Sequence, residues 1–250
     1  MKILGIIPAR YGSVRFPGKP LVDMAGKTMI QRVYEQVSKA SCFSLIVVAT
    51  DNQQIFSEVK KFGGEACMTR QDHISGTDRC FEALTQQNQS FDYVINVQGD
   101  EPFIQPAQIE LLAGLLDGNT EIATLIKKVL DPEMIFNPNV VKAVVAKNKE
   151  ALYFSRSPIP HVRNTPEKEW IKHATFYKHI GMYAYRTDIL ANITKLSVGS
   201  LETAESLEQL RWLQNGFRIM TEETDTESLG VDTPDDLKKA IALLSEEEPN

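Results

Sequence analysis

The first hundred residues alternate short apolar runs with segments of helical periodicity, and this alternation restricts the chain to few architectures. Buried runs fall at residues 2–7, 44–50, 65–68 and 92–97. Between them, apolar side chains recur at helical spacing over residues 28–40, and further helices are expected at 52–62 and 77–84. Strands that alternate with helices predict an α/β fold with a mainly parallel sheet. Ligands of such sheets bind beyond the carboxyl ends of the strands.

After about residue 121, strand-like segments follow one another with few helices between them. They lie at 122–129, 140–147, 151–155 and 179–185, and they predict a smaller antiparallel lobe. A charged helix is expected at 201–213, a strand at 217–221, and a last helix at 233–244, capped by Thr233 with Pro234 at its first position. We therefore expect a core of residues 1–120 with 217–244, a lobe of residues 121–216, and a disordered tail of residues 245–250.

Charge and cysteine content exclude several classes of protein. The net charge of −6 argues against binding to nucleic acid or to an anionic membrane through bulk electrostatics. The three cysteines, Cys42, Cys67 and Cys80, have no C-x-x-C spacing, which fits a reducing compartment better than a disulfide framework or a zinc site. No apolar run approaches the ~18 residues that a membrane span needs. The apolar start is followed at once by Pro8 and Arg10, which predicts a buried first strand rather than a signal peptide, and hence a cytoplasmic protein.

The segment after the first expected strand, residues 8–20, combines three cations with two glycines and a serine. Glycines let backbone N–H groups approach an anion, and Arg and Lys supply charge, so this loop suits a phosphate. It is not a Walker A loop, because the spacing from Gly12 to Lys19 is one residue too long and Pro20 replaces the Ser or Thr. The Rossmann G-x-G-x-x-G is absent too. Taken alone, a basic surface turn remains an alternative.

Two aspartates are placed to meet at the carboxyl edge of the sheet. Asp100 follows the expected strand at 92–97, and Asp232 precedes the last helix. Magnesium binds through one or two carboxylates plus substrate phosphates, so the pair predicts a magnesium site. Asp232 by itself also fits an ordinary helix-start turn. The small polar loop at 69–77 suits the polar edge of a pyrimidine, although it fits a helix-capping loop equally well.

Several blocks of sequence, in order along nearly the whole chain, resemble one enzyme family. They are IIPARYGSVRFPGKPL at 6–21, MTRQDHISGTDR at 68–79, NVQGDEPFI at 96–104, YFSRSPIP at 153–160, KHIGMYAYR at 178–186, LEQLRWL at 207–213 and GVDTPDDL at 230–237. The chain is similar in these blocks to the 3-deoxy-manno-octulosonate (Kdo) cytidylyltransferases. The resemblance implies a Rossmann-like sheet of the sugar nucleotidyltransferase type with a smaller antiparallel lobe.

The resemblance also implies an activity and a set of site residues. The enzyme would transfer the cytidylyl group of CTP to the anomeric hydroxyl of Kdo, for lipopolysaccharide biosynthesis, as a magnesium-dependent homodimer. The lobe would bind the acid sugar and form the dimer, with 153–160 as a candidate contact. The implied nucleotide-binding residues are Ala9, Arg10, Ser13, Lys19, Ser75, Gly76, Arg79 and Gln98, with Arg15 supporting the loop. Arg10, Lys19 and Asp100 would be catalytic, and Asp100 and Asp232 would hold the metal. The implied sugar ligands are Arg156, His179, Tyr183, Glu208 and Gln209.

Three rival interpretations make different demands on the sequence. A sister enzyme for sialate or an amino variant of Kdo shares the nucleotide loop and differs in the acceptor pocket. A non-catalytic nucleotide sensor predicts a damaged loop or metal pair, whereas Arg10, Lys19, Asp100 and Asp232 are all present. A glycosyltransferase typically carries a D-x-D motif, and this chain has none. The sequence alone therefore argues against the nucleotide sensor and the glycosyltransferase more strongly than against a sister enzyme.

Overall fold

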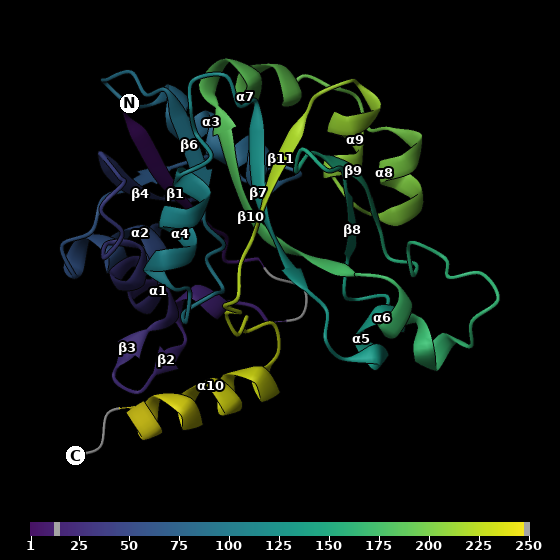
Figure 1. The fold of residues 1–250 in the computed structure, drawn as a ribbon. Helices are drawn as coiled ribbons and strands as arrows, with labels where there is room; N and C mark the ends of the chain where they lie inside the picture. Colours follow the sequence, from purple (N-terminus) through teal and green to yellow (C-terminus); the bar gives the residue numbers. More distant parts are fainter. Residues whose placement is uncertain (13–15, 248–250) are drawn as a thin grey trace. The chain divides into compact units, whose positions relative to one another are not determined.

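The computed structural model describes residues 1–12 and 16–247 (Figure 1), and it divides into two compact units. The first unit holds Met1–Glu110 and Glu227–Asn250, and the second holds Leu111–Thr226. These boundaries differ from the expected core and lobe at residues 111–120 and 217–226. The strand expected at 217–221 belongs to the second unit because it hydrogen-bonds along a strand of that unit. No helix in the described part of the chain is long and apolar enough to cross a membrane.

The first unit is built on four parallel strands, in agreement with the predicted parallel sheet. Their order is β6 (Tyr93–Asn96), β1 (Ile3–Ala9), β4 (Leu45–Thr50) and β5 (Ala66–Met68). β1 is central and its pairing with β6 ends at Ile6–Asn96, so Pro8 lies where β1 pairs with β4 alone. A proline, which has no backbone N–H, can occupy such a position because the unpaired side of the strand needs no hydrogen-bond donor. β1 therefore extends through Pro8 to Ala9, two residues beyond the predicted run.

Three predicted helices connect these strands, and each has a local cause. They are α1 (Met29–Val37), α2 (Gln53–Lys61) and α3 (Gly76–Thr85). The Asn52 side chain caps α2 by accepting the backbone N–H groups of Gln54 and Ile55 at 2.9 and 3.2 Å. Ser75 caps α3 by accepting the N–H of Asp78 at 3.1 Å. The local sequence did not predict η1 (Lys19–Leu21), the hairpin of β2 (Asp23–Met24) and β3 (Lys27–Thr28), or α4 (Pro106–Ala113), whose residues fall on both sides of the sequence boundary between the units.

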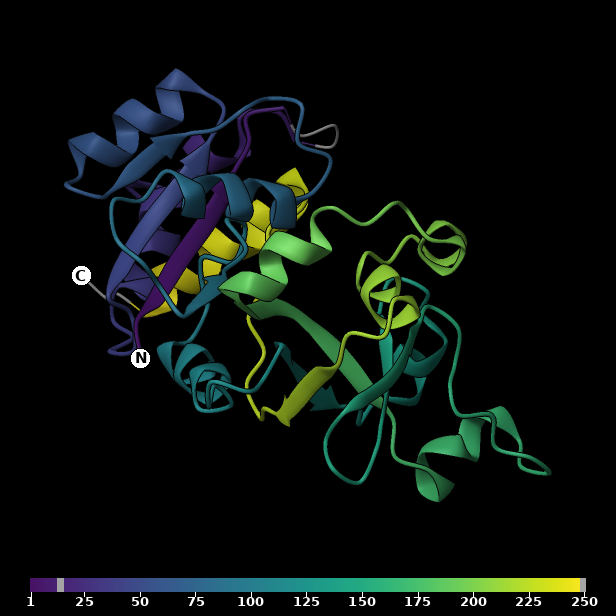
Figure 2. The ribbon, with the colours of Figure 1, turned by 90° about the horizontal axis from the view of Figure 1, so that it is seen from above.

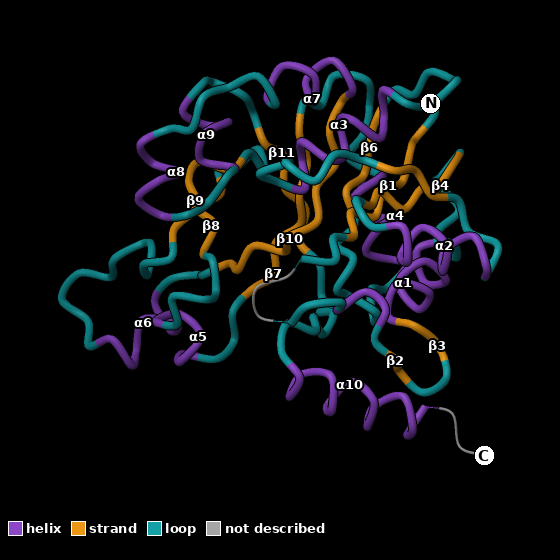
Figure 3. The backbone as a smooth tube through the Cα atoms, turned by 180° about the vertical axis from the view of Figure 1, so that it is seen from behind, coloured by secondary structure: helices purple, strands orange, loops and turns teal. Residues whose placement is uncertain are grey.

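The last helix, α10 (Pro234–Glu247), returns to the first unit and packs on β2 (Figure 3). Its cap is the predicted one, since the N–H of Asp236 donates to the Thr233 hydroxyl at 3.2 Å. Ala240 and Leu244 are buried against Met24 and Val231. The expectation of a disordered tail is wrong for residues 245–247, because glutamate favours a helix and α10 continues through it. Residues 248–250 lie outside the described part of the chain.

The second unit is a five-stranded mixed sheet with short helices. The strand order is β11 (Ile219–Glu223), β7 (Ile122–Lys128), β10 (Tyr177–Arg186), β8 (Lys142–Val145) and β9 (Ala151–Ser155). β11 runs parallel to β7, and the other pairs are antiparallel, as predicted for this part of the chain. The helices are α5 (Pro132–Phe136), η2 (Glu167–Glu169), α6 (Trp170–His173), α7 (Thr187–Ile193), α8 (Ser200–Glu205) and α9 (Gln209–Gln214) (Figure 2).

One predicted helix of the second unit is wrong. The charged segment 201–213 was expected to form a single helix, but it forms α8 and α9. The break lies at Ser206, whose φ of 52° and ψ of 48° place it in the left-handed region. A helix cannot continue through a left-handed residue, because the following N–H groups turn away from the helical ladder. Glu208, Gln209 and Trp212 therefore belong to a separate short element.

Candidate active site

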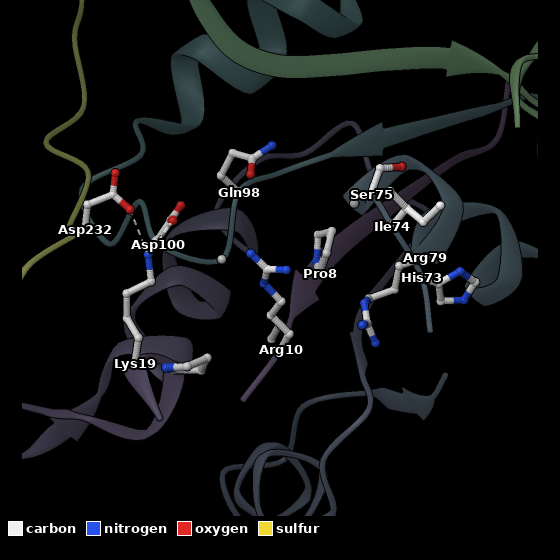
Figure 4. Close-up of a pocket in the computed structure, with 14 residues that line it drawn as sticks. Pro8, Arg10, Lys19, His73, Ile74, Ser75, Arg79, Gln98, Asp100 and Asp232 are labelled. Atoms are coloured by element: carbon white, nitrogen blue, oxygen red, sulfur yellow. Dashed lines mark hydrogen bonds and ion pairs between the residues drawn. The ribbon is translucent and has the colours of Figure 1, made fainter. Parts of the chain in front are cut away.

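A cavity of about 320 Å³ opens in the first unit at the carboxyl ends of β1 and β6. The start of α3 and the residues just before α10 complete its wall (Figure 4). Its lining consists of Pro8, Ala9, Arg10, Lys19, Pro20, His73, Ile74, Ser75, Gly76, Arg79, Gln98, Gly99, Asp100 and Asp232. This list contains every nucleotide and metal ligand expected from the sequence except Ser13. Ser13 and Arg15 lie outside the described residues.

The loop after β1 is folded back on itself before it reaches η1. The N–H of Gly18 donates to the carbonyl oxygen of Tyr11 at 3.0 Å. Gly18 has a φ of 72°, a conformation that glycine adopts without the steric cost of a Cβ atom. This turn lets Lys19 begin η1 with its side chain in the cavity, while Arg10 enters the same cavity from the end of β1 (Figure 4). Both expected phosphate-binding cations thus line one space.

Lys19 connects the two aspartates that the sequence predicted as a pair. Its ammonium nitrogen lies 2.6 Å from Oδ2 of Asp100 and 3.1 Å from Oδ1 of Asp232 (Figure 4). Asp232 is held near Asp100 by the backbone, because the N–H of Val231 donates to the Asp100 carbonyl oxygen at 2.9 Å. The carboxylates therefore converge on a single cationic group. Within residues 1–12 and 16–247, no cluster of three or more His, Cys, Asp or Glu side chains is arranged around a metal-sized site.

The polar loop between β5 and α3 contains a helix cap and also lines the cavity. Ser75 caps α3, so the helix-capping interpretation is confirmed, and Ser75 also lines the cavity. A Cβ atom built on Gly76 would lie 3.7 Å from Asn96 Nδ2 and 3.8 Å from Pro8 Cγ, which are ordinary contacts. Packing within the protein therefore does not require a glycine here. The missing side chain instead leaves room on the cavity side.

Arg79 lines the same part of the cavity, and its guanidinium is paired within the protein. It is 4% exposed, and it donates to the Thr69 hydroxyl at 2.5 Å and to Oδ2 of Asp51 at 2.8 Å. These bonds tie α3 to the end of β4 and to the residue after β5. The guanidinium charge is thus neutralised by a buried carboxylate, as a buried charge requires. Arg79 therefore supports this wall of the cavity from within the protein.

Gly99 is a site residue that sequence reasoning overlooked. A Cβ atom at this position would lie 2.6 Å from the carbonyl oxygen of Pro8. The backbones after β1 and β6 therefore approach each other so closely that only glycine fits. This contact sets the spacing between Arg10 and Asp100, and the G-D dipeptide at the end of an apolar run was the available signal. His73 and Ile74 were quoted within a motif but given no role, although both line the cavity.

The five expected sugar ligands all lie in the second unit, and Arg156 is already heavily engaged there. Its guanidinium donates to the backbone oxygens of Glu205, Pro138 and Ser206 at 2.7, 3.0 and 3.4 Å. The backbone N–H of Arg156 donates to the Glu205 carboxylate at 2.8 Å. The structure thus gives Arg156 a part in holding β9 to the end of α8.

His179 and Tyr183 form one aromatic cluster with Phe154. The imidazole lies 5.2 Å from the Phe154 ring and 5.1 Å from the Tyr183 ring, measured between centroids. Burial lowers the pKa of the His179 imidazole from its usual 6.5 to about 3, so the ring is neutral at pH 7. Burial, and then the nearby charge of Glu208, raise the pKa of the Tyr183 phenol well above its usual value. Glu208 accepts a hydrogen bond from Arg211 at 3.1 Å.

Two of these side chains present buried polar atoms without a protein partner. The Tyr183 hydroxyl and the Gln209 amide nitrogen have no hydrogen-bond partner among the described residues. Tyr183 is 7% exposed and Gln209 is 5% exposed. Leaving such a buried group unpaired costs about 1–3 kcal/mol.

Comparison with known proteins places the chain in a family. Residues 4–223 match the family described as Cytidylyltransferase. A 3-deoxy-manno-octulosonate cytidylyltransferase of Cytophaga hutchinsonii is 57% identical, over 98% of each chain. The enzyme of that name from Bacteroides thetaiotaomicron is 55% identical, again over 98% of each chain.

Solved structures agree with this assignment. A CMP:2-keto-3-deoxy-manno-octonic acid synthetase complexed with CTP is 44% identical, with a TM-score of 0.92 over 99% of this chain and all of the other. A 4-diphosphocytidyl-2C-methyl-D-erythritol synthase of Anaerococcus prevotii, at 13% identity and a TM-score of 0.64, shares the fold alone. The sequence blocks, the α/β fold and these comparisons agree, and the chain belongs to the 3-deoxy-manno-octulosonate cytidylyltransferase family.

Proposed function

We propose that this protein transfers the cytidylyl group of CTP to the anomeric hydroxyl of Kdo, releasing pyrophosphate and forming CMP-Kdo. The observation that carries the proposal is the 44% identity, over 99% of the chain, to a CMP-Kdo synthetase complexed with CTP. The cavity of the first unit supports it, because this cavity gathers Arg10, Lys19, Asp100 and Asp232. On this proposal the first unit binds the nucleotide and the second unit binds the acid sugar.

The reaction is a direct displacement at phosphorus. The anomeric oxygen forms a bond to the α-phosphorus, the bond from that phosphorus to the bridging oxygen breaks, and the hydroxyl proton passes to solvent. Negative charge grows on the phosphate oxygens and on the departing pyrophosphate. Arg10 and Lys19 line the cavity where they can neutralise this charge, which is the electrostatic effect that dominates such transfers. Ser75, Gly76 and Gln98 would contact the base, and Ala9 would contact the nucleotide from the end of β1.

The residues of the cavity fit a magnesium ion. Asp100 and Asp232 offer hard oxygen donors that already converge on the Lys19 ammonium. Two carboxylates plus substrate phosphates are the usual magnesium donors. The ion, when bound, supplies Lewis-acid polarisation of the phosphate and of the attacking hydroxyl. In this proposal Lys19 moves its contact from the two carboxylates to the phosphates, so it remains paired with negative charge throughout.

The neutral side chains of the second unit support the recognition of sugar hydroxyls. Thr124 Oγ1 lies 2.8 Å from the Met182 carbonyl oxygen and 3.1 Å from that of Ile180, so its single proton is directed to the carbonyls. It therefore accepts from His179 Nε2, which lies 3.0 Å away, and this assigns the proton of the neutral imidazole to Nε2. His179 Nδ1 then carries a lone pair and accepts from a hydroxyl. On this proposal His179 contacts a sugar hydroxyl, with Tyr183 and Gln209 as neutral donors.

We also propose that the protein is a cytoplasmic homodimer. β9 pairs with β8, and its Leu152 side chain is 59% exposed. An edge strand with an exposed large apolar residue is suited to contact a second chain. This supports residues 153–160 as part of the dimer contact, and light scattering coupled to size-exclusion chromatography measures the assembly directly. Leu152→Lys should shift a dimer towards monomer if this strand lies in the contact.

The proposed activity is tested with a panel of nucleotides and acceptors. The purified protein is incubated with magnesium, with CTP or UTP, and with Kdo, an 8-amino analogue of Kdo, or N-acetylneuraminate, and pyrophosphate release is followed. We expect release with CTP and Kdo and much slower release with UTP. Preferred turnover of the amino sugar or of the sialate would assign the protein to a sister activity. No release with any acceptor, in a protein that binds CTP, would contradict an enzymatic function.

A further inference from the structure

Glu82 lies on α3 and holds the two ends of the loop that forms one wall of the cavity. Its Oε2 atom accepts the backbone N–H of Arg70 at 3.0 Å, and the same oxygen is paired with His73 Nε2. Its Oε1 atom accepts from Gln86 Nε2 at 3.2 Å, and that amide nitrogen also donates to the Met68 carbonyl oxygen at 2.8 Å. One carboxylate thus ties the end of β5, the start of the loop and the histidine before Ser75.

The anchor of this loop is the imidazole of His73. Only 7% of the His73 side chain is exposed, whereas the next residue, Ile74, is 87% exposed and lines the cavity. Figure 4 shows the imidazole directed away from Arg10 and Gln98, so the ring does not face the middle of the cavity. Ser75 and Gly76, which also line the cavity, follow at the start of α3. His73 therefore fixes the backbone from which the cavity-lining residues project.

The charge state of Glu82 suits this role. Burial acts to raise its pKa, but the Arg70 N–H and the hydrogen bond and charge of His73 outweigh burial and lower it below the usual value. The carboxylate is therefore ionised at neutral pH and makes charge-assisted hydrogen bonds. By contrast, the ion pair within the loop is exposed: 69% of the Arg70 side chain and 73% of the Asp72 side chain are accessible to solvent. Such an exposed pair contributes little to holding the loop in place.

We infer that Glu82, acting through His73, is a positioning residue for recognition of the nucleotide base. The inference rests on the proposed function, in which Ser75 and Gly76 contact the cytosine. A protein whose loop is held in the binding geometry binds its ligand with full affinity. When the loop samples other conformations, the apparent affinity falls in proportion to the fraction of molecules whose loop is in the binding geometry. Glu82 does not line the cavity, so its effect on the nucleotide is carried by the loop.

The test replaces the carboxylate by an isosteric amide and measures nucleotide binding directly. In Glu82→Gln we expect the Kd and KM for CTP to rise about tenfold, because the neutral amide has a single acceptor oxygen and must lose either the bond from Gln86 to Oε1 or both bonds to Oε2. The kcat at saturating CTP and the KM for Kdo should stay within twofold of the unsubstituted protein. Preference for CTP over UTP should fall, because a loosened loop no longer holds its polar groups against one base edge.

Glu35→Gln is the matched control. Glu35 is also a helical carboxylate with a lowered pKa, and it accepts from Lys27 and Gln31 at 2.7 and 2.9 Å, but it does not line the cavity. This variant should bind CTP as the unsubstituted protein does. If Glu82→Gln and Glu35→Gln bind CTP equally well, Glu82 does not position the loop. A fall in kcat with unchanged CTP affinity would also overturn the inference.

A second pair of variants covers the case in which Glu82→Gln does not fold. His73→Gln keeps an N–H donor close to the position of Nε2, whereas His73→Leu removes it. We expect His73→Gln to retain most of the CTP affinity and His73→Leu to lose about tenfold. Equal affinities in these two variants would contradict the anchoring role. If the unsubstituted protein itself binds no CTP, the proposed function fails before this inference is reached.

Discussion

Lys19 Nζ lies 2.6 Å from Asp100 Oδ2, and the same nitrogen lies 3.1 Å from Asp232 Oδ1. A residue of the phosphate-binding loop thus contacts both proposed metal ligands. The two aspartate side chains remain 33% and 49% exposed, while the lysine side chain is 12% exposed. A divalent cation held by these carboxylates would therefore compete with this ammonium group for the same oxygens.

Lys19→Met should increase the affinity of the protein for a divalent metal measured without nucleotide. Removal of the competing ammonium leaves two carboxylates whose mutual repulsion a dication relieves. We expect binding of Mn²⁺, followed by electron paramagnetic resonance, to tighten several-fold, while the KM for CTP rises because a phosphate contact is lost. Lys27→Met is the control, since Lys27 pairs with Glu35 and does not line the cavity. Weaker Mn²⁺ binding in Lys19→Met would show that the lysine does not compete with the metal.

Asp100→Asn should preserve the fold and abolish most of the turnover. The amide keeps the volume of the side chain but not its charge, so the site loses one of its two anionic donors. We expect kcat to fall about 10²–10³-fold, as when one charge-stabilising group is removed from other active sites. Pyrophosphate release across a magnesium titration measures this effect. Near-normal rates at saturating magnesium would remove Asp100 from the metal site.

Gly99→Ala should destabilise the protein and lower its activity. The new Cβ atom would lie 2.6 Å from the Pro8 carbonyl oxygen, so the backbones after β1 and β6 must move apart. Forcing extra volume into a packed site costs about 1–3 kcal/mol, and the shift separates Arg10 from Asp100. Gly12→Ala is the control, because its Cβ atom would have no heavy atom of the described residues within 4 Å. Thermal melts and kcat/KM for CTP distinguish the two variants, and equal stability would contradict the close approach.

Stability should fall as the pH is lowered from 7 to 5, in part because of His179. Burial lowers the pKa of this imidazole to about 3, below the 6.5 expected in the unfolded chain. The unfolded chain therefore binds more protons in this range, so the stabilisation is present above pH 6.5 and is lost as the pH falls towards 3. The free energy of unfolding is measured in urea at pH 7 and at pH 5. Between these two pH values, His179→Asn should lose about 1–2 kcal/mol less of this free energy than the unsubstituted protein. His173→Asn, at an exposed position, should lose the same free energy of unfolding between these pH values as the unsubstituted protein.

The strands and most helices of the first unit follow from local sequence. A buried parallel strand needs a continuous apolar run, and α2, α3 and α10 carry their own caps at Asn52, Ser75 and Thr233. Such signals lie within a few residues of the structure that they produce. For the same reason, contiguous blocks such as residues 6–21 and 96–104 were sufficient to predict the family.

Errors arose where a distant contact or an unusual backbone angle overrides the local pattern. The periodicity of 201–213 is helical throughout, but Ser206 adopts a left-handed conformation and divides the segment. Nor did the local sequence indicate that the Arg156 guanidinium donates to three backbone oxygens. β11 looked like a strand of the core, but strand pairing places it on β7.

The sequence by itself determined the family, the parallel strands and the identity of the cations and carboxylates, because these depend on residue type and short-range spacing. Only the tertiary structure decided which of those groups meet. The bond from Val231 to Asp100 brings two remote aspartates to Lys19, and Glu82 connects the two ends of a loop through one oxygen. Such contacts depend on the path of the backbone between residues far apart in the chain, and residue type and spacing do not specify that path.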